Sequence, residues 1–185
     1  MTEAEFILCE MLVLRFQRHD RSAAEELVAL FEKPLLYYLR RLVRSEDDAW
    51  ELLQETWISV FRALPGLRDT RALPAFLYRT ARNHALALLR HRQADVRLHA
   101  TVDVPQDSTD TEPSFTAEDA AAVHAALDRL PPVQSEVLTL FFLEDLTTRE
   151  IALVLGIPPG TVKSRLFHAK KALKAILLEG VSHVI

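Results

Sequence analysis

The chain contains little cysteine and little glycine. Its single cysteine, Cys9, cannot form an internal disulfide, and no cysteine pair has metal-binding spacing, so we expect a cytoplasmic protein in a reducing compartment. Only four glycines occur and none builds a glycine-rich phosphate loop. His84, His91 and His99 lack a matching cluster of carboxylates or cysteines, which favours ordinary histidines over a metal site. We therefore expect no cofactor and no enzymatic activity.

A long uninterrupted hydrophobic run is also missing. The apolar stretch from Phe6 to Phe16 is interrupted by Glu10 and Arg15, and it lacks a basic leader and a small-residue cleavage site. The pattern predicts an amphipathic helix packed on the rest of its domain, with no signal peptide and no direct membrane insertion. Partner binding by its apolar face is the alternative.

Helix-favouring residues are abundant instead. The chain has 185 residues, 49% of them hydrophobic, and its apolar residues recur mainly at helical spacing. Between Ala94 and Pro113 this periodicity disappears, while Asp, Ser, Thr and Pro accumulate. We therefore predict an all-α protein with two helical domains, residues 1–94 and 116–185, joined by a flexible acidic linker at residues 95–115.

Local signals mark four helices in the first domain. Ser22 and Glu25 have capping-box spacing and open a helix that Pro34 should break or kink. Ser45 is a weaker N-cap signal for a helix ended by Pro65-Gly66. Pro74 suits the first turn of a long helix that reaches about Gln93.

The charge is unevenly distributed. A formal net charge of −4 argues against indiscriminate coating of nucleic acid. Basic residues are nevertheless concentrated at positions 62–97 and 147–175, while acidic residues gather at 46–55 and 103–119. One basic segment usually marks a solvated face, but two in an acidic chain indicate two phosphate-facing surfaces.

The last third carries a helix-turn-helix pattern. Thr147 and Glu150 form a capping box for a short helix, Gly156 supplies a left-handed residue, and a second helix follows Pro158-Pro159. Apolar residues of the second helix fall on one face and polar and basic residues on another, as a DNA-recognition helix requires. A preceding helix, roughly residues 133–143, follows Pro131-Pro132.

These motifs resemble a known family, the extracytoplasmic-function (ECF) sigma factors of the sigma-70-like family. The second domain is similar to region 4 of that family at Leu130-Pro131-Pro132, Val137-Leu138, Glu150-Ile151-Ala152, Leu155-Gly156-Ile157-Pro158 and Gly160-Thr161-Val162-Lys163-Ser164-Arg165-Leu166. The first domain is similar to region 2 at Gln54-Glu55-Thr56-Trp57, Leu77-Tyr78-Arg79 and Ala81-Arg82-Asn83. The resemblance covers nearly the whole chain.

The resemblance implies an alternative sigma factor that binds core RNA polymerase and directs promoter-specific initiation. Region 2 would bind the β′ clamp helices, region 4 would meet the β flap, and an anti-sigma factor would regulate both; no small-molecule substrate is implied. The implied polymerase-binding residues are Asp48, Leu52, Gln54, Glu55 and Trp57.

The resemblance also implies two DNA-binding sets. The minus-ten set is Arg68, Arg71, Phe76, Tyr78, Arg79, Arg82, Asn83 and Arg90. The minus-thirty-five set is Thr161, Lys163, Ser164, Arg165, His168, Lys170 and Lys171, with Lys174 as a further backbone contact. Phe76 and Tyr78 are equally well explained as core residues.

The chain departs from the family pattern at Phe76, Ala87 and His168, where the family usually has Trp, Asp and Arg. Two alternatives therefore stay open. One is a sigma-like interaction module that binds polymerase without reading DNA, and the other is a helix-turn-helix regulator without sigma activity.

Overall fold

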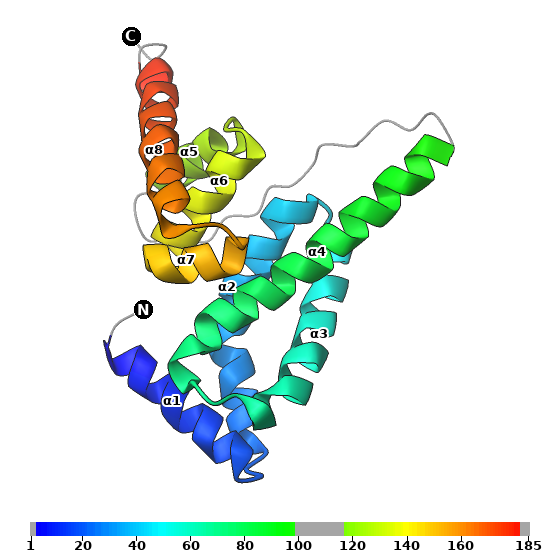
Figure 1. Cartoon of the computed structure of the whole chain (residues 1–185). Helices are drawn as coiled ribbons and strands as arrows, with labels where there is room; N and C mark the ends of the chain where they lie inside the picture. The colour runs from blue at the N-terminus through cyan, green and yellow to red at the C-terminus, as the bar shows by residue number, and fades with distance from the viewer. Residues whose placement is uncertain (1–2, 99–116, 182–185) are drawn as a thin grey trace.

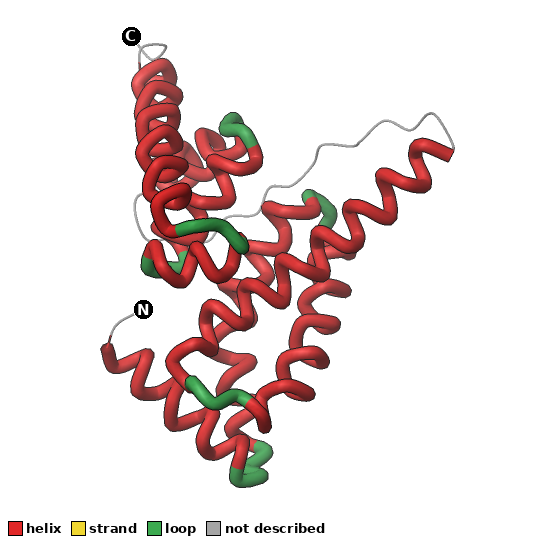
Figure 2. The backbone as a smooth tube through the Cα atoms, viewed as in Figure 1, coloured by secondary structure: helices red, strands yellow, loops and turns green. Residues whose placement is uncertain are grey.

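The computed structural model describes residues 3–98 and 117–181, and within these ranges it consists of helices without any strand (Figures 1 and 2). The α-helices are α1 (Glu3–Gln17), α2 (Ser22–Val43), α3 (Glu46–Ala63), α4 (Leu73–Leu98), α5 (Ala117–Asp128), α6 (Pro132–Leu138), α7 (Thr148–Leu155) and α8 (Pro159–Val181). Two 3₁₀ turns, η1 (Leu64–Gly66) and η2 (Thr70–Ala72), connect α3 to α4, and a π-helical segment, η3 (Thr139–Leu143), follows α6. The all-α prediction is confirmed.

Helices α1 to α4 form the first domain around α2. Helix α2 packs against α1, α3 and α4, and it contributes Leu27, Phe31, Leu35 and Leu39 to the core at four-residue spacing. The helix runs through Pro34 without interruption, so a break does not occur there, while a kink at Pro34, the other part of the prediction, stays a prediction. Burial on both sides of Pro34 outweighs the loss of one backbone hydrogen bond there.

The predicted N-terminal cap is present in α3 and absent in α2. Ser45 caps α3 as predicted, with its side chain accepting a hydrogen bond from the Asp48 backbone N–H. The Ser22 capping box does not form, because Ser22 lies inside the helix and its hydroxyl and backbone N–H both donate to Asp20. Asp20 therefore fixes the entry into α2.

Helices α5 to α8 form the second domain, in which α8 packs against α5, α6 and α7. The capping box of Thr147 and Glu150 is present, and Gly156 ends α7 with a φ of 67°. Only a residue that tolerates the left-handed region fits this turn without strain. Val162, Leu166 and Ala169 of α8 are buried as the periodicity predicts, which confirms the helix-turn-helix.

The two domains touch each other. Helix α4 packs against α7, and α2 contacts α6 and η3 (Figure 1). Figure 1 also shows α4 crossing the first domain and projecting beyond it at its C-terminal end. In the ranges that the structure covers, no helix combines the length and the apolar content needed to cross a membrane.

Candidate functional site

Helix α3 presents one face to the core and the other to solvent. Leu52 and Trp57, expected to bind polymerase, lie in the core, because they share a face with Leu53, Thr56 and Val60 toward α2 and α4. Gln54 and Glu55 are exposed. The predicted polymerase-binding set is thus divided between a buried part that shapes the helix and an exposed part that a partner can touch.

Asp48, the remaining member of this set, is paired inside the domain. Its carboxylate receives two hydrogen bonds from the Arg92 guanidinium, at 2.5 and 2.6 Å, and only 12% of its side chain is exposed. Such a bidentate pair is stronger and more directional than a single hydrogen bond. Asp48 therefore joins the start of α3 to α4 and does not point toward solvent.

Two large apolar residues lie on the exposed face of α3. Trp50 is 39% exposed and Ile58 is 52% exposed. With Gln54 they form a line at four-residue spacing, which places them on one side of the helix. Exposed aromatic and aliphatic residues bounded by polar ones are typical of protein interfaces. The sequence contains the information needed to find this face, because residues 50, 54 and 58 lie on the side of the helix opposite to the buried residues 52, 53, 56 and 60.

The expected minus-ten residues lie on α4 and on the segment before it, and most are exposed. Arg68, Arg71, Arg79, Asn83 and Arg90 reach the surface. Arg79, Asn83 and Arg90 form one stripe along α4. Arg71 also pairs with Glu10 of α1, at 3.3 Å between Nε and Oε1. Two exposed arginines on α4 and two on the segment before it suit a strand of phosphates.

Two members of the minus-ten set face the second domain. Tyr78 is buried, and its hydroxyl donates to the Glu144 carboxylate. Arg82 donates from Nε to Glu136 Oε1 at 2.8 Å. Phe76 is half-buried and packs against the core. The exposed arginines of α4 and the residues that contact the second domain therefore lie on neighbouring sides of the helix.

Burial changes the chemistry of Glu144. Its removal from water raises the pKa of the carboxyl from 4.5 to about 7, and the hydrogen bond from Tyr78 partly opposes this rise. Burial also raises the pKa of Tyr78 well above its usual value of 10, and the nearby Glu144 carboxylate adds to that effect. Tyr78 is therefore the proton donor of the pair.

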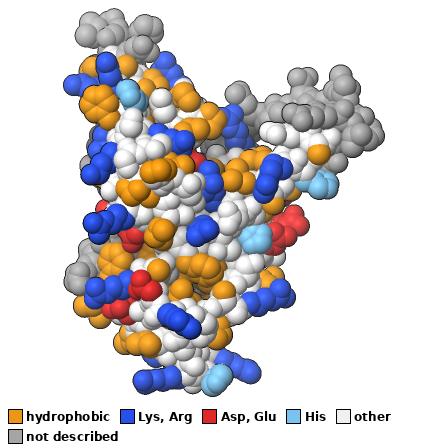
Figure 3. Space-filling model, viewed as in Figure 1, with side chains coloured by type: hydrophobic (Ala, Val, Ile, Leu, Met, Phe, Trp, Pro, Cys, Tyr) orange, Lys and Arg blue, Asp and Glu red, His pale blue; other side chains and the backbone are white. Residues whose placement is uncertain are grey.

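The expected minus-thirty-five residues lie on α8, the helix that follows the turn at Gly156. Lys163, Ser164, His168 and Lys171 are exposed along one stripe, while Thr161 and Arg165 are partly buried beside it. Phe167, which sequence reasoning missed, is 68% exposed within the stripe. Figure 3 shows Lys and Arg side chains distributed over the whole visible face, several of them over the upper part, where α8 lies.

Lys170 differs from the other members of this set. Its ammonium lies 4.5 Å from the Phe141 ring centroid and 4.9 Å from that of Phe142, a cation–π arrangement with η3. Phe142 is itself 56% exposed. Lys170 therefore lies on the same side of α8 as Lys163, seven residues away, and also contacts an aromatic cluster of η3.

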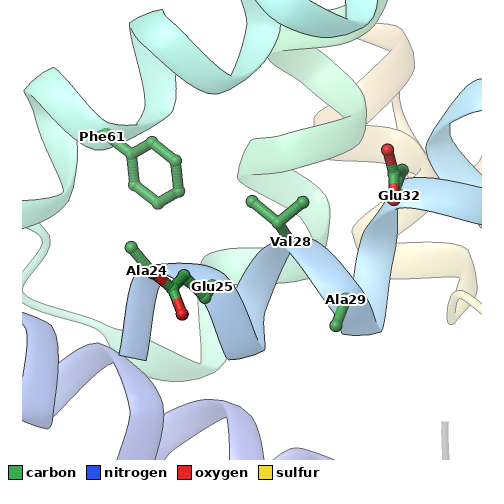
Figure 4. A pocket seen from close by; sticks show the side chains of 6 residues that line it. All are labelled: Ala24, Glu25, Val28, Ala29, Glu32 and Phe61. Atoms are coloured by element: carbon green, nitrogen blue, oxygen red, sulfur yellow. The ribbon is translucent and has the colours of Figure 1, made fainter. Parts of the chain in front are cut away.

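The described residues offer no enzyme-like centre. An open hollow lies between α2 and α3, lined mostly by apolar side chains, and its lining residues are Ala24, Glu25, Val28, Ala29, Glu32 and Phe61 (Figure 4). Among the residues that the structure describes, no group of three or more His, Cys, Asp or Glu side chains could hold a metal ion.

One arrangement resembles a catalytic triad. His84 lies between Glu55 and Ser59, with its Nδ1 at 3.4 Å from the Glu55 carboxylate and its Nε2 at 3.0 Å from the Ser59 hydroxyl. None of the three lines the hollow between α2 and α3 or the pocket beside Glu144. The histidine connects α3 to α4.

Comparison with known proteins identifies two family models in this chain. The model for Sigma-70 region 2 matches residues 27–94, and the model for Sigma-70, region 4 matches residues 120–173. The RNA polymerase sigma-H factor of Pseudomonas aeruginosa is 32% identical over 182 residues, covering 91% of this chain and 93% of the relative. The ECF RNA polymerase sigma-E factor of Escherichia coli K12 is 29% identical over 181 residues, covering 92% and 94%.

Two solved structures share the fold. CnrH in complex with the cytosolic domain of CnrY has a TM-score of 0.67 at 25% identity, covering 92% of this chain and 97% of that one. The sigma factor RpoE in complex with the anti-sigma factor NepR from Bartonella quintana has a TM-score of 0.73 at 22% identity, covering 83% and 95%.

Proposed function

This chain belongs to the sigma-70 family as an ECF sigma factor that directs transcription initiation, and on that premise we propose which of its surfaces performs each step. The first domain (region 2) would bind the polymerase clamp and the minus-ten element, and the second domain (region 4) would bind the minus-thirty-five element. The protein would act in the cytoplasm without an enzymatic activity of its own, because bond formation belongs to the polymerase.

The clamp-binding surface in this proposal is the exposed face of α3. It consists of Trp50, Glu51, Gln54, Glu55 and Ile58. The apolar residues would be desolvated at the centre and the acidic ones would set orientation against a basic partner. Leu52, Trp57 and Asp48 would contribute by holding α3 in place.

The minus-ten surface is the outer stripe of α4 together with the segment before it. Arg79, Asn83 and Arg90 are exposed along α4, and Arg68 lies close before it in the chain. Arginines would hold the phosphates of the non-template strand, while Asn83 offers both a donor and an acceptor to an unstacked base. Binding exposed bases favours the melted promoter over duplex DNA.

The minus-thirty-five surface is the stripe of α8. Arg165 is the strongest base reader, because an arginine can make a bidentate contact to guanine that discriminates by roughly 1–3 kcal/mol. Lys163 and Lys171 are exposed and would neutralise phosphates. Phe167 would supply an apolar contact of the kind that recognises a thymine methyl group.

An anti-sigma factor is the proposed regulator. The relatives CnrH and RpoE are each solved in complex with a partner, the cytosolic domain of CnrY and the anti-sigma factor NepR. A comparable partner of this chain would compete with polymerase for surfaces of regions 2 and 4.

The observation that carries the proposal is the presence, in order, of an α3–α4 pair with an exposed interface face and basic stripe, followed by a capped helix-turn-helix. The test is titration with core RNA polymerase, then run-off transcription from a promoter library with and without the protein. Binding and initiation from a defined promoter set support it. Binding without initiation would indicate an interaction module, and duplex binding without polymerase binding a helix-turn-helix regulator.

A further inference from the structure

Helix α1 is fixed to the connection between α3 and α4. The Gln17 amide donates hydrogen bonds from Nε2 to the backbone carbonyls of Leu64, at 3.1 Å, and Leu67, at 2.9 Å. The whole of α1 precedes residue 27, where the match to the region 2 model begins. The connection that carries Arg68 is therefore held in place by a helix outside that match.

Further contacts join the same two parts of the domain. The Phe16 and Phe61 rings are stacked, with 5.4 Å between their centroids. Glu10 Oε1 accepts hydrogen bonds from the Thr70 hydroxyl at 3.1 Å and from Arg71 Nε at 3.3 Å. Because these contacts are spread along α1 and along the connection, the two parts form one continuous surface.

Asp20 fixes the turn between α1 and α2. Its carboxylate accepts hydrogen bonds from Arg15 Nε at 2.8 Å, from the Ser22 hydroxyl at 2.8 Å and from the Ser22 backbone N–H at 3.0 Å. A carboxylate that accepts a hydrogen bond from the backbone two residues later is a common way of setting a turn. The residues on either side of this turn, Arg18 and Arg21, therefore start from a defined backbone position.

Four exposed arginines are chain neighbours of the residues that make these contacts, and we call them the junction patch: Arg18, Arg21, Arg62 and Arg68. Among the side chains that the structure describes, none of the four has a carboxylate within ion-pair distance. Carboxylate partners belong instead to Arg15, Arg40, Arg41, Arg71, Arg82 and Arg92. The chain thus has a net charge of −4 and yet leaves the junction patch without a neutralising partner in these ranges.

The junction patch is continuous with the minus-ten surface. Arg68 belongs to both, and the chain leads from it through η2 into α4. Figure 3 shows Lys and Arg side chains together with a histidine at the lower end of the visible face, where Figure 1 shows the turn between α1 and α2. Positive charge therefore extends beyond α4 to the end of the first domain at which α1 meets α2.

We propose that the junction patch binds phosphates of the non-template strand beside the minus-ten element, so that the DNA path continues from α4 over the end of α1. The inference rests on the proposed function, which places single-stranded DNA against Arg68 and α4. Unpaired guanidinium groups suit phosphates, because their planar set of donors can bind two phosphate oxygens at once. An acidic protein segment offers similar chemistry, but the continuity with the DNA-binding surface favours DNA.

Phosphate binding would give this patch a recognisable signature. Phosphate contacts position DNA and carry no sequence information directly. On a single strand, each neutralised phosphate contributes about 0.7 to the slope of log K against log salt. The junction patch should therefore raise affinity and salt dependence for every sequence, and leave the preference for the minus-ten element to Asn83 and its neighbours on α4.

The test uses holoenzyme assembled from core polymerase and the full-length chain. Fluorescence anisotropy follows its binding, at several salt concentrations, to a labelled single-stranded oligonucleotide that carries the minus-ten element found by run-off transcription. Arg18→Gln combined with Arg21→Gln should weaken binding about 3- to 10-fold at low salt and lower the slope by about 1.4. The ratio of affinities for this element and for a scrambled oligonucleotide should stay the same.

Matched variants separate charge in the junction patch from charge in general. Lys33→Gln with Arg44→Gln removes two other exposed cations, on α2 and at its C-cap, and should leave affinity and slope at the wild-type values. Arg18→Lys with Arg21→Lys should restore the slope, because lysine neutralises a phosphate as a point charge. Circular dichroism checks that each variant is folded. Arg18→Gln alone, with a slope change of about 0.7, is the milder variant.

Shortening the oligonucleotide one nucleotide at a time from each end locates the contact. Wild-type holoenzyme should lose affinity and slope at a truncation that the double variant tolerates, because the phosphates removed there are the ones that the junction patch binds. Coupling of this kind between a protein variant and a DNA truncation reports a direct interaction.

Three results would overturn the junction patch as a DNA-binding surface. They are a double variant with the wild-type slope, a slope change no larger than that of the Lys33 and Arg44 control, and weaker assembly with core polymerase at an unchanged DNA slope. The third result would assign the patch to an acidic protein segment. The proposed function fails separately, when wild-type holoenzyme neither prefers a minus-ten element nor initiates transcription.

Discussion

Arg92 and Asp48 join the C-terminal half of α4 to the first turn of α3 through a bidentate ion pair. Asp48 is shielded, while Arg92 is 49% exposed, so the pair stands at the edge of the core. This pair therefore helps to hold the proposed clamp-binding helix and the proposed promoter-binding helix in register, together with the contacts of His84 to Glu55 and Ser59.

The first prediction follows from this pair. Arg92→Ala leaves the Asp48 carboxylate shielded without its partner, and we expect the free energy of unfolding to fall by about 1–2 kcal/mol, discounted for the exposure of the arginine. Arg90→Ala is the control, because its Nε bonds only to its own helix at Leu86. Urea denaturation followed by circular dichroism measures both. Equal losses would show that the ion pair contributes nothing specific.

The second prediction concerns the exposed face of α3. Ile58→Ala should weaken binding to core polymerase by roughly 1 kcal/mol or more, about fivefold, with little effect on folding, because an exposed apolar residue gains its stabilisation only when a partner covers it. Ile7→Ala on α1 is a matched control, since Ile7 is 57% exposed and Ile58 52%. Fluorescence anisotropy with labelled protein gives the affinities; similar losses for both variants would place the interface elsewhere.

The third prediction separates base reading from phosphate binding on α8. Arg165→Ala should cost roughly 1–3 kcal/mol on the preferred upstream element and relax the sequence preference there. Lys171→Ala should instead weaken all sequences similarly and reduce the dependence of log K on log salt by about one. Promoter-library transcription and salt titrations distinguish the two. If Arg165→Ala keeps the full preference, the base reader is another residue.

The fourth prediction is a pH dependence of stability that arises from Glu144. Because burial raises the pKa of Glu144 from 4.5 to about 7, the folded protein binds this proton more tightly than the unfolded chain, in which the carboxyl is solvated. The contribution of Glu144 to stability is therefore greatest below pH 4.5, and it is lost as pH rises through about 7. The upper limit of the effect is about 3 kcal/mol.

Other groups near Glu144 restrict the useful pH range. Tyr78, Tyr38 and Glu5 approach it from α4, α2 and α1, and Asp145 is its chain neighbour. Burial, together with Arg41, lowers the pKa of His124 below 6.5, so protonation of His124 opposes folding at lower pH. The free energy of unfolding should accordingly be measured by urea denaturation between about pH 6.5 and 8.5. We expect it to fall with rising pH in the wild type and in Glu26→Gln, and to lose this dependence in Glu144→Gln.

Sequence patterns predicted best what local chemistry determines. The Thr147–Glu150 box, the Gly156 turn and the buried face of α8 follow from residues within a few positions of each other, and the structure has them as predicted. The capping box at Ser22 was wrong because Asp20, two residues earlier, offers a competing acceptor. The π-helical segment η3 has no comparable local signal and depends on packing.

The sites were harder to predict, because a family motif does not say which way a side chain points. Leu52 and Trp57 belong to the motif through their packing, whereas Trp50 and Ile58 reach the surface. Nothing in the sequence pairs Tyr78 with Glu144 or Arg82 with Glu136, since each pair is far apart in the chain and meets only when two domains touch. Long-range pairs of this kind require the tertiary structure.

The turn at Gly156 has a consequence for exchanging promoter preference. Both boundaries of α7 are encoded between Thr147 and Gly156, and the buried face of α8 uses different positions from its exposed stripe. The exposed residues of the recognition helix can therefore change without altering the residues that fold and orient it. Residues at 163, 164, 165, 167, 168 and 171 are expected to diverge between paralogues, and they can be redesigned to make orthogonal regulators, while the buried residues of the domain stay unchanged.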